Sequence, residues 1–120
     1  MNMKVFVLTL VLPLIGLAAD PSPLGKWNLD QSIAGNQGSM VCTFEQGESG
    51  LAGRCESPQL KSAVTGKIDG KTITWTLKSE YQGSPLTLSY SGTFDGEKIK
   101  GTVTVPEYSV DGEFAASRAE

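Results

Sequence analysis

Two cysteines and a scatter of carboxylates are the side chains of this 120-residue chain that could do chemistry. Cys42 and Cys55 could form a structural disulfide or exchange thiols, and two suitably placed carboxylates could hydrolyse a glycosidic bond. The chain contains no His, which excludes Ser-His-Asp and Cys-His catalytic sites. The usual metal ligands are reduced to carboxylates, so we expect no metal site and no cofactor.

The strand pattern described below directs most of these carboxylates away from any interior. Alternation places five on the outer face: Asp30, Glu45, Glu56, Asp111 and Glu113. Three others lie in turns: Asp69, Asp95 and Glu97. The sequence therefore predicts that the protein is not an enzyme.

The first 19 residues have the features of a signal peptide. Lys4 precedes an apolar run, Val5 to Leu17, that ends in the small residues Ala18 and Ala19. The run is too short to span a bilayer. We expect a periplasmic or secreted protein with no membrane insertion after cleavage. Residues 20–120 would form one domain.

The charge of residues 20–120 restricts the partners. Without Lys4 the count is 9 basic and 13 acidic residues, a net charge of −4. That charge repels nucleic acid and anionic lipid. We expect a monomer whose partner is a small apolar ligand or an exported protein.

Beyond the signal peptide the chain alternates Thr, Val, Ile and aromatic residues with polar ones, between Gly, Pro, Asp and Asn. This pattern predicts eight strands, at 24–30, 38–46, 50–57, 62–68, 72–79, 86–94, 99–105 and 108–118. Three links, at 47–50, 69–72 and 95–98, have tight hairpin chemistry and share one end. The other four, at 31–37, 58–61, 80–85 and 106–107, are expected to be roomier loops at the opposite end, the mouth.

The turns set the register of the strands. A loop at 69–72 pairs Ile68 with Ile73, and the equivalent loop at 95–98 pairs Phe94 with Ile99. A two-residue turn at Glu48 and Ser49 places Cys42 opposite Cys55. Together with export, this register predicts a cross-strand disulfide.

Alternation then gives one continuous apolar lining. The expected inward residues are Trp27, Leu29, Met40, Cys42, Phe44, Leu51, Cys55, Val64, Ile68, Ile73, Trp75, Leu77, Leu86, Leu88, Tyr90, Phe94, Ile99, Val103, Val105, Val110, Phe114 and Ala116. Inward glycines, among them Gly53 and Gly66, make room for large rings. A sheet with one apolar face and no helix to cover it must close on itself. The fold class is therefore all-β, a single eight-stranded antiparallel up-and-down barrel.

Residues at both ends of the domain carry a family resemblance. Gly25-Lys-Trp27 in the first strand, with Arg118 in the last, resembles the signature of the calycin superfamily, the lipocalins and avidins. The resemblance implies that Arg118 packs over Trp27 and closes the barrel bottom, which gives both a structural role. The chain also resembles the Gly-rich barrel domains of exported bacterial proteins, for which no defined activity follows.

Further segments resemble avidins in order along the chain, from Asn36-Gln-Gly-Ser39-Met40 to Tyr90-Ser-Gly92. Avidins cage biotin with several tryptophans and polar residues of early strands. The resemblance places Trp75 on one cage position, whereas Tyr90, Val103 and Phe114 occupy positions on later strands. Ser39 matches a polar contact. Biotin-type binding is therefore one alternative function.

The first functional hypothesis is an exported binding module for a small, mostly apolar ligand that enters through the mouth. Its candidate ligand-binding residues are Leu29, Ser39, Met40, Trp75, Leu77, Leu88, Tyr90, Val103 and Tyr108. The second is an interaction or inhibitor protein that acts through the loops at 31–37 and 80–85 or the arm at 20–23, since small barrels with Gly-x-Trp starts also resemble periplasmic protease inhibitors.

Overall fold

The computed structural model describes residues 22–48, 50–58 and 60–119. The signal peptide predicted for residues 1–19 lies outside the described residues. Among these residues eight strands follow one another, with a short 3₁₀ helix, η3 (Pro106–Tyr108), before the last strand. The strands are β1 (Gly25–Ile33), β2 (Asn36–Gly47), β3 (Gly50–Ser57), β4 (Leu60–Asp69), β5 (Thr72–Tyr81), β6 (Ser84–Phe94), β7 (Lys98–Val105) and β8 (Val110–Arg118).

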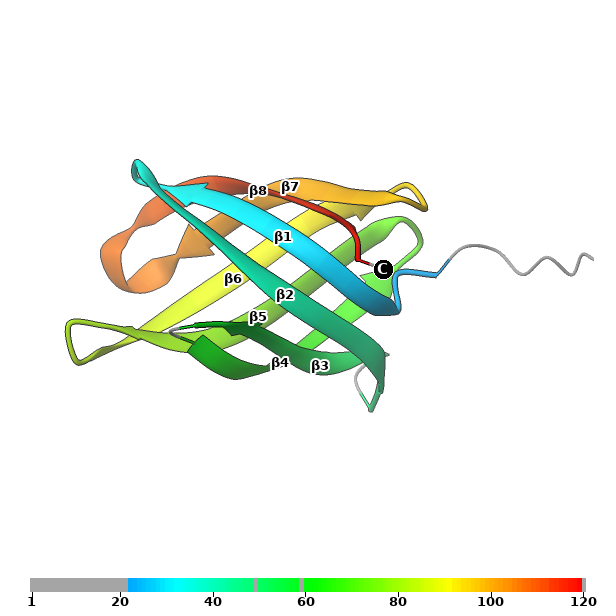
Figure 1. The fold of residues 1–120 in the computed structure, drawn as a ribbon, viewed down its shortest axis with the longest axis horizontal. Helices are drawn as coiled ribbons and strands as arrows, with labels where there is room; N and C mark the ends of the chain where they lie inside the picture. Colours follow the sequence, from blue (N-terminus) through cyan, green and yellow to red (C-terminus); the bar gives the residue numbers. More distant parts are fainter. Residues whose placement is uncertain (1–21, 49, 59, 120) are drawn as a thin grey trace, which may run out of the picture.

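Each strand pairs antiparallel with the next, and β1 pairs with β8, so the sheet is a closed barrel (Figure 1). This confirms the predicted fold class. The predicted registers are also confirmed: Ile68 lies opposite Ile73 and Phe94 opposite Ile99. Cys42 lies opposite Cys55 and forms the predicted disulfide, with a Cα–Cα distance of 4.0 Å.

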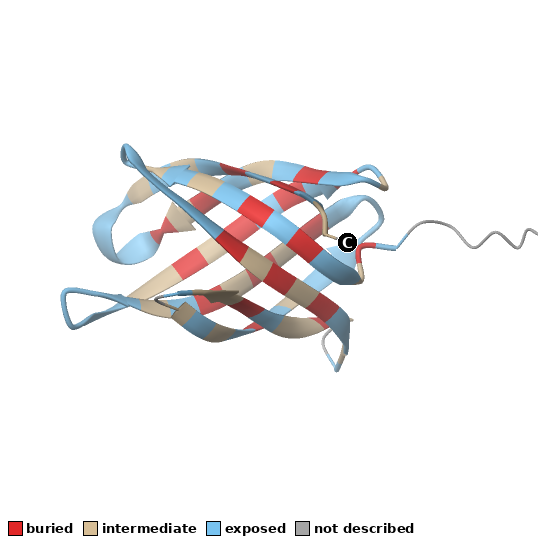
Figure 2. Cartoon of the chain, viewed as in Figure 1, coloured by how far each residue is buried: buried red, intermediate tan, exposed pale blue. Residues whose placement is uncertain are grey.

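Alternate side chains fill the barrel, as Figure 2 shows by the alternation of buried and exposed positions along the strands. Nearly all of the predicted lining is buried, but three residues of it are not. Leu86 and Val110 are half-buried, and Ile68 is exposed. Ile68 lies beside the β4–β5 turn, and Leu86 and Val110 lie at the mouth, because alternation sets a residue's face but not its depth along the barrel.

Arg118 closes the barrel at the end where β8 finishes, hereafter the closed end. Its guanidinium carbon lies 4.2 Å from the centroid of the Trp27 ring, which confirms the predicted stacking. Arg118 Nη1 donates to the Leu24 carbonyl oxygen (2.7 Å) and Nε to that of Gly96 (3.3 Å). Trp27 Nε1 donates to the Pro23 carbonyl oxygen at 2.9 Å. One cation thus joins the first strand, the last strand and the β6–β7 turn.

Gly66 shows why glycines lie on the inner face. It is the direct partner of Trp75, and a Cβ at Gly66 would lie 2.8 Å from both Cα and Cβ of Trp75. Gly53 lies opposite Phe44 in the same way. A Cβ would also lie 2.0 Å from the Thr74 carbonyl oxygen at Gly66 and 1.9 Å from the Thr43 carbonyl oxygen at Gly53, so both glycines allow the close approach of the paired strand that carries the large ring.

The mouth differs from the prediction. The roomy loops expected at 31–37 and 80–85 are instead two-residue turns, because β1, β2, β5 and β6 all continue further than predicted. Ala34 and Gly35 have φ of 51° and 84°, and Gln82 and Gly83 have φ of 53° and 83°. Positive φ at both central residues is typical of type I′ hairpins. Tyr108, expected to open the last strand, instead ends η3.

The Glu107 carboxylate of η3 takes the place of a strand partner for β6 beyond the end of the β6–β7 ladder. The β6–β7 ladder begins only at Ser89, which leaves the Thr87 amide without a strand partner. Glu107 Oε1 accepts from Thr87 N (2.9 Å) and Oε2 from Thr87 Oγ1 (2.6 Å). Lys78 Nζ of β5 also donates to Thr87 Oγ1, at 3.0 Å. The pair Glu107–Thr87 therefore fastens η3 to β6.

This contact predicts a pH dependence of stability. The two hydrogen bonds from Thr87 lower the pKa of Glu107, so the contact stabilises the fold above the ordinary carboxyl pKa of about 4.3 and is lost as the pH falls through the lowered value. Glu107→Gln should unfold at lower urea concentration near pH 7 and lose less stability on acidification than the wild type. The control is Glu113→Gln, which removes an exposed carboxylate and leaves the Thr87 contact intact. Identical acid profiles for Glu107→Gln and the wild type would contradict the prediction.

Candidate functional site

A cavity of about 480 Å³ opens at the mouth, between the β1–β2 and β5–β6 hairpins and the β7–η3–β8 link. Most of its apolar lining is aliphatic. These side chains are Ile33, Met40, Leu60, Leu86, Leu88, Val105 and Val110. Polar lining residues include Gln31, Asn36, Ser39 and Ser79. A mostly apolar cup with a few polar groups has the composition of a small-molecule site.

Two tyrosines form one side of the rim. Tyr81 ends β5 and Tyr108 ends η3, and their rings meet edge to face with centroids 6.1 Å apart. Their exposed fractions are 53% and 50%, high for large aromatic side chains. The Glu107–Thr87 contact fixes the segment that carries Tyr108, so this part of the rim is held against the wall.

Below the cavity the barrel is filled by a cluster of aromatic rings. The rings of Trp75 and Tyr90 are stacked, with centroids 4.8 Å apart and planes at 11°. The Phe114 ring packs edge-on against both. The centroid of the Phe44 ring lies 4.9 Å from that of Trp75. Trp75 Nε1 is buried and has no hydrogen-bond partner within the part of the chain that the structure describes. The described barrel is therefore a cup above a packed aromatic core.

A polar pair marks the boundary between core and cavity. Gln31 of β1 continues the inward alternation of Trp27 and Leu29, and its Oε1 accepts a hydrogen bond from the Tyr90 hydroxyl of β6. Burial raises the pKa of Tyr90, which keeps the phenol protonated and able to donate. Because Tyr90 is buried and Gln31 lines the cavity, the Gln31 amide forms part of the cavity floor.

The structure divides the nine candidate ligand-binding residues into two groups. Four line the mouth cavity: Ser39, Met40, Leu88 and Tyr108. The other five are buried outside its lining: Leu29, Trp75, Leu77, Tyr90 and Val103. Ser39 is exposed at the rim, and its hydroxyl donates to Asp30 Oδ1 at 2.6 Å.

Several lining residues were not among the sequence candidates. They are Gln31, Ile33, Ala34, Asn36, Gln37, Gly38, Ser57, Leu60, Leu86, Val105 and Val110. Gln31 and Ile33 could have been found by continuing the alternation of β1 beyond Asp30. The alternation was not followed that far because residues 31–37 were interpreted as a loop.

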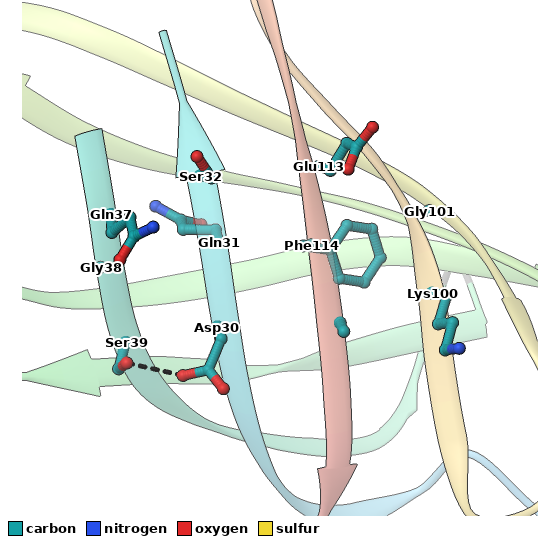
Figure 3. Close-up of a pocket in the computed structure, with 11 residues that line it drawn as sticks. Asp30, Gln31, Ser32, Gln37, Gly38, Ser39, Lys100, Gly101, Glu113 and Phe114 are labelled. Carbon is teal, nitrogen blue, oxygen red and sulfur yellow. Dashed lines mark hydrogen bonds between the residues drawn. The ribbon is translucent and has the colours of Figure 1, made fainter. Parts of the chain in front are cut away.

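A second concavity, of about 770 Å³, lies over β7, β8, β1 and β2 (Figure 3) and shares four lining residues with the mouth cavity: Gln31, Gln37, Gly38 and Ser39. Asp30, Lys100 and Glu113 line it, and all three are exposed. Within the described residues, no group of three or more acidic or cysteine side chains could hold a metal ion. These charges remain in water, and the concavity lacks the mostly apolar lining of the mouth cavity.

Comparison of the chain with protein-family models, with curated proteins and with solved structures gave no match. The described residues include no helix long and apolar enough to cross a membrane. The fold and the two disulfide-bonded cysteines are compatible with the calycin-like resemblance and with export.

Proposed function

We propose that this protein is an exported, calycin-like binding module that takes a small, mostly apolar molecule into its mouth cavity. The observation that carries the proposal is the cavity of about 480 Å³ with aliphatic walls and an aromatic rim. Its volume falls in the range of about 300–1,000 Å³ typical of small-molecule sites. The tight hairpins fix the walls in advance, which reduces the entropy lost on binding.

Biotin-type binding has less support than a ligand at the mouth. The position that resembles a cage tryptophan is Trp75, and its ring is 2% exposed between Tyr90, Phe44 and Phe114. The protein's own rings thus occupy the space that a caged ligand would need. Calorimetry with biotin is the direct comparison, and we expect no measurable heat of binding.

An interaction or inhibitor protein is the second candidate. The exposed pair Tyr81 and Tyr108 favours it, since aromatic residues on a fixed rim are common anchors in protein interfaces. A partner would then be an exported protein, and the cavity would be dispensable. This alternative predicts that small apolar molecules do not bind the mouth.

The proposal is tested with the neutral apolar dye Nile red. We expect saturable fluorescence enhancement with the wild-type protein, and a co-purified small molecule in native mass spectra after gentle purification. Leu86→Glu places an unpaired charge in the cavity wall and should weaken dye binding about tenfold or more. Thr102→Glu adds the same charge on the exposed outer face and serves as the matched control. No dye binding and no co-purified molecule would refute the proposal in favour of the protein-partner alternative.

A further inference from the structure

We propose that the mouth cavity selects uncharged ligands whose polar group is a hydrogen-bond acceptor, and that this group enters first and accepts from the Gln31 carboxamide. The inference rests on the proposed binding of a small molecule at the mouth. It adds the chemical class of that molecule, such as a neutral ketone, ester, lactone or amide with an apolar body, and its orientation in the cavity.

The lack of charge in the cavity is the first argument. The chain has 23 side chains of Asp, Glu, Lys and Arg, yet among the described residues that line the cavity none is charged. A ligand carboxylate or ammonium would exchange its hydration for apolar walls without a counter-ion, at a cost of several kcal/mol. The cavity therefore discriminates against ions of either sign.

The floor supplies the second argument. The Tyr90 hydroxyl donates a hydrogen bond to Gln31 Oε1 from the core side. The Gln31 amide nitrogen is therefore available to donate to a ligand. That nitrogen lies 4.0 Å from the position of a Cβ on Gly38, a cavity residue whose missing side chain leaves space above the amide. An amide N–H can only donate, so its complement is an acceptor.

Orientation follows from the same two features. A ligand that entered with its hydrocarbon end first would cover the Gln31 amide with apolar atoms and leave a donor buried without a partner, at a cost of about 1–3 kcal/mol. A ligand that enters with its acceptor first satisfies the amide and places its apolar body against Met40, Leu86 and Leu88. The second arrangement is therefore favoured.

The experiment uses competition with Nile red by four molecules of equal carbon number: butyrophenone, butylbenzene, 4-propylbenzoate and 4-propylbenzylammonium. One additional hydrogen bond predicts that butyrophenone binds about fivefold tighter than butylbenzene. Both ions should bind at least about tenfold more weakly than butylbenzene. In Gln31→Leu, butyrophenone should bind no tighter than butylbenzene, whereas Ser32→Ala, on the exposed outer face of the same strand, should keep the preference.

Gln31→Leu leaves the Tyr90 hydroxyl without its partner and could unfold the barrel. The double variant Gln31→Leu/Tyr90→Phe removes both polar groups together and preserves the packing; it should show the same loss of preference. Equal affinity for ketone and hydrocarbon, tighter binding of either ion, or a preference that persists without Gln31 would overturn this inference alone. If neither Nile red nor any of the four molecules binds, the proposed function fails with it.

Discussion

Trp75→Ala should lower the free energy of unfolding by about 3–5 kcal/mol, the range for removing a large aromatic residue from a packed core. Trp75 is 2% exposed and contacts three other rings, so the cavity left behind cannot be filled by a small rearrangement. Its partner Gly66 has no side chain to move into the space. Urea unfolding followed by circular dichroism measures the loss.

Two further variants show whether the loss of stability comes from the buried ring of Trp75. Thr76→Ala changes a residue of the same strand on the opposite face and should alter stability by no more than about 0.5 kcal/mol. Trp75→Phe keeps a ring in the cluster and removes the indole N–H that has no partner, so its loss should be smaller than that of Trp75→Ala. A loss below about 1 kcal/mol for Trp75→Ala would show that this ring does not hold the core together.

The double variant Cys42→Ala/Cys55→Ala should lower the free energy of unfolding by about 3 kcal/mol, the loop-entropy value for a disulfide that closes a short hairpin. Both cysteines are fully buried, and they join β2 to β3 at directly opposed positions. The cross-link therefore restricts the unfolded chain while fitting the native register. Urea unfolding at matched pH provides the comparison.

Reduction separates the cross-link from the packing of the side chains. Wild-type protein unfolded in urea with dithiothreitol should lose stability to a similar extent, whereas the double variant should be insensitive to the reductant. Folded wild type should react slowly, because neither sulfur is accessible to solvent. A wild type as stable with reductant in urea as without it would contradict the assigned contribution.

The closed end was predictable because its turns carry strong local signals. Asp69-Gly70 and Asp95-Gly96 mark tight turns, and each turn fixes the register of the strands that flank it. Once the register was set, alternation gave the inner face, including the contact of Cys42 with Cys55. These are short-range features of sequence, and the closed barrel follows from burying one face.

The strand ends at the mouth were predicted less well because the residues there are typical of loops. Ala34 and Gln82 adopt positive φ, which is uncommon for residues other than Gly and Asn. Pro85 also argued against a strand. It is tolerated because it has the same orientation as Thr87, whose amide faces the side where β7 provides no partner.

Five of the nine candidate residues therefore lie in the packed core and outside the lining of the mouth cavity. The inward direction of Leu29, Leu77 and Val103 was predicted, but direction gives no information on how far the core extends toward the mouth. That depth depends on how rings from distant strands stack, as Trp75 of β5 does against Phe114 of β8. The pairing of Gln31 with Tyr90, 59 residues apart in sequence, is likewise a product of the tertiary fold.

The pairing of β1 with β8 has a consequence for the order of folding. The other seven pairings join neighbouring strands and can form early as local hairpins, whereas Trp27 meets Arg118 only across almost the whole described chain. Until the last strand is available, β1 and β7 both present unpaired edges to other chains. During synthesis the incomplete barrel is thus most vulnerable to aggregation, and the late docking of the last strand ends that exposure.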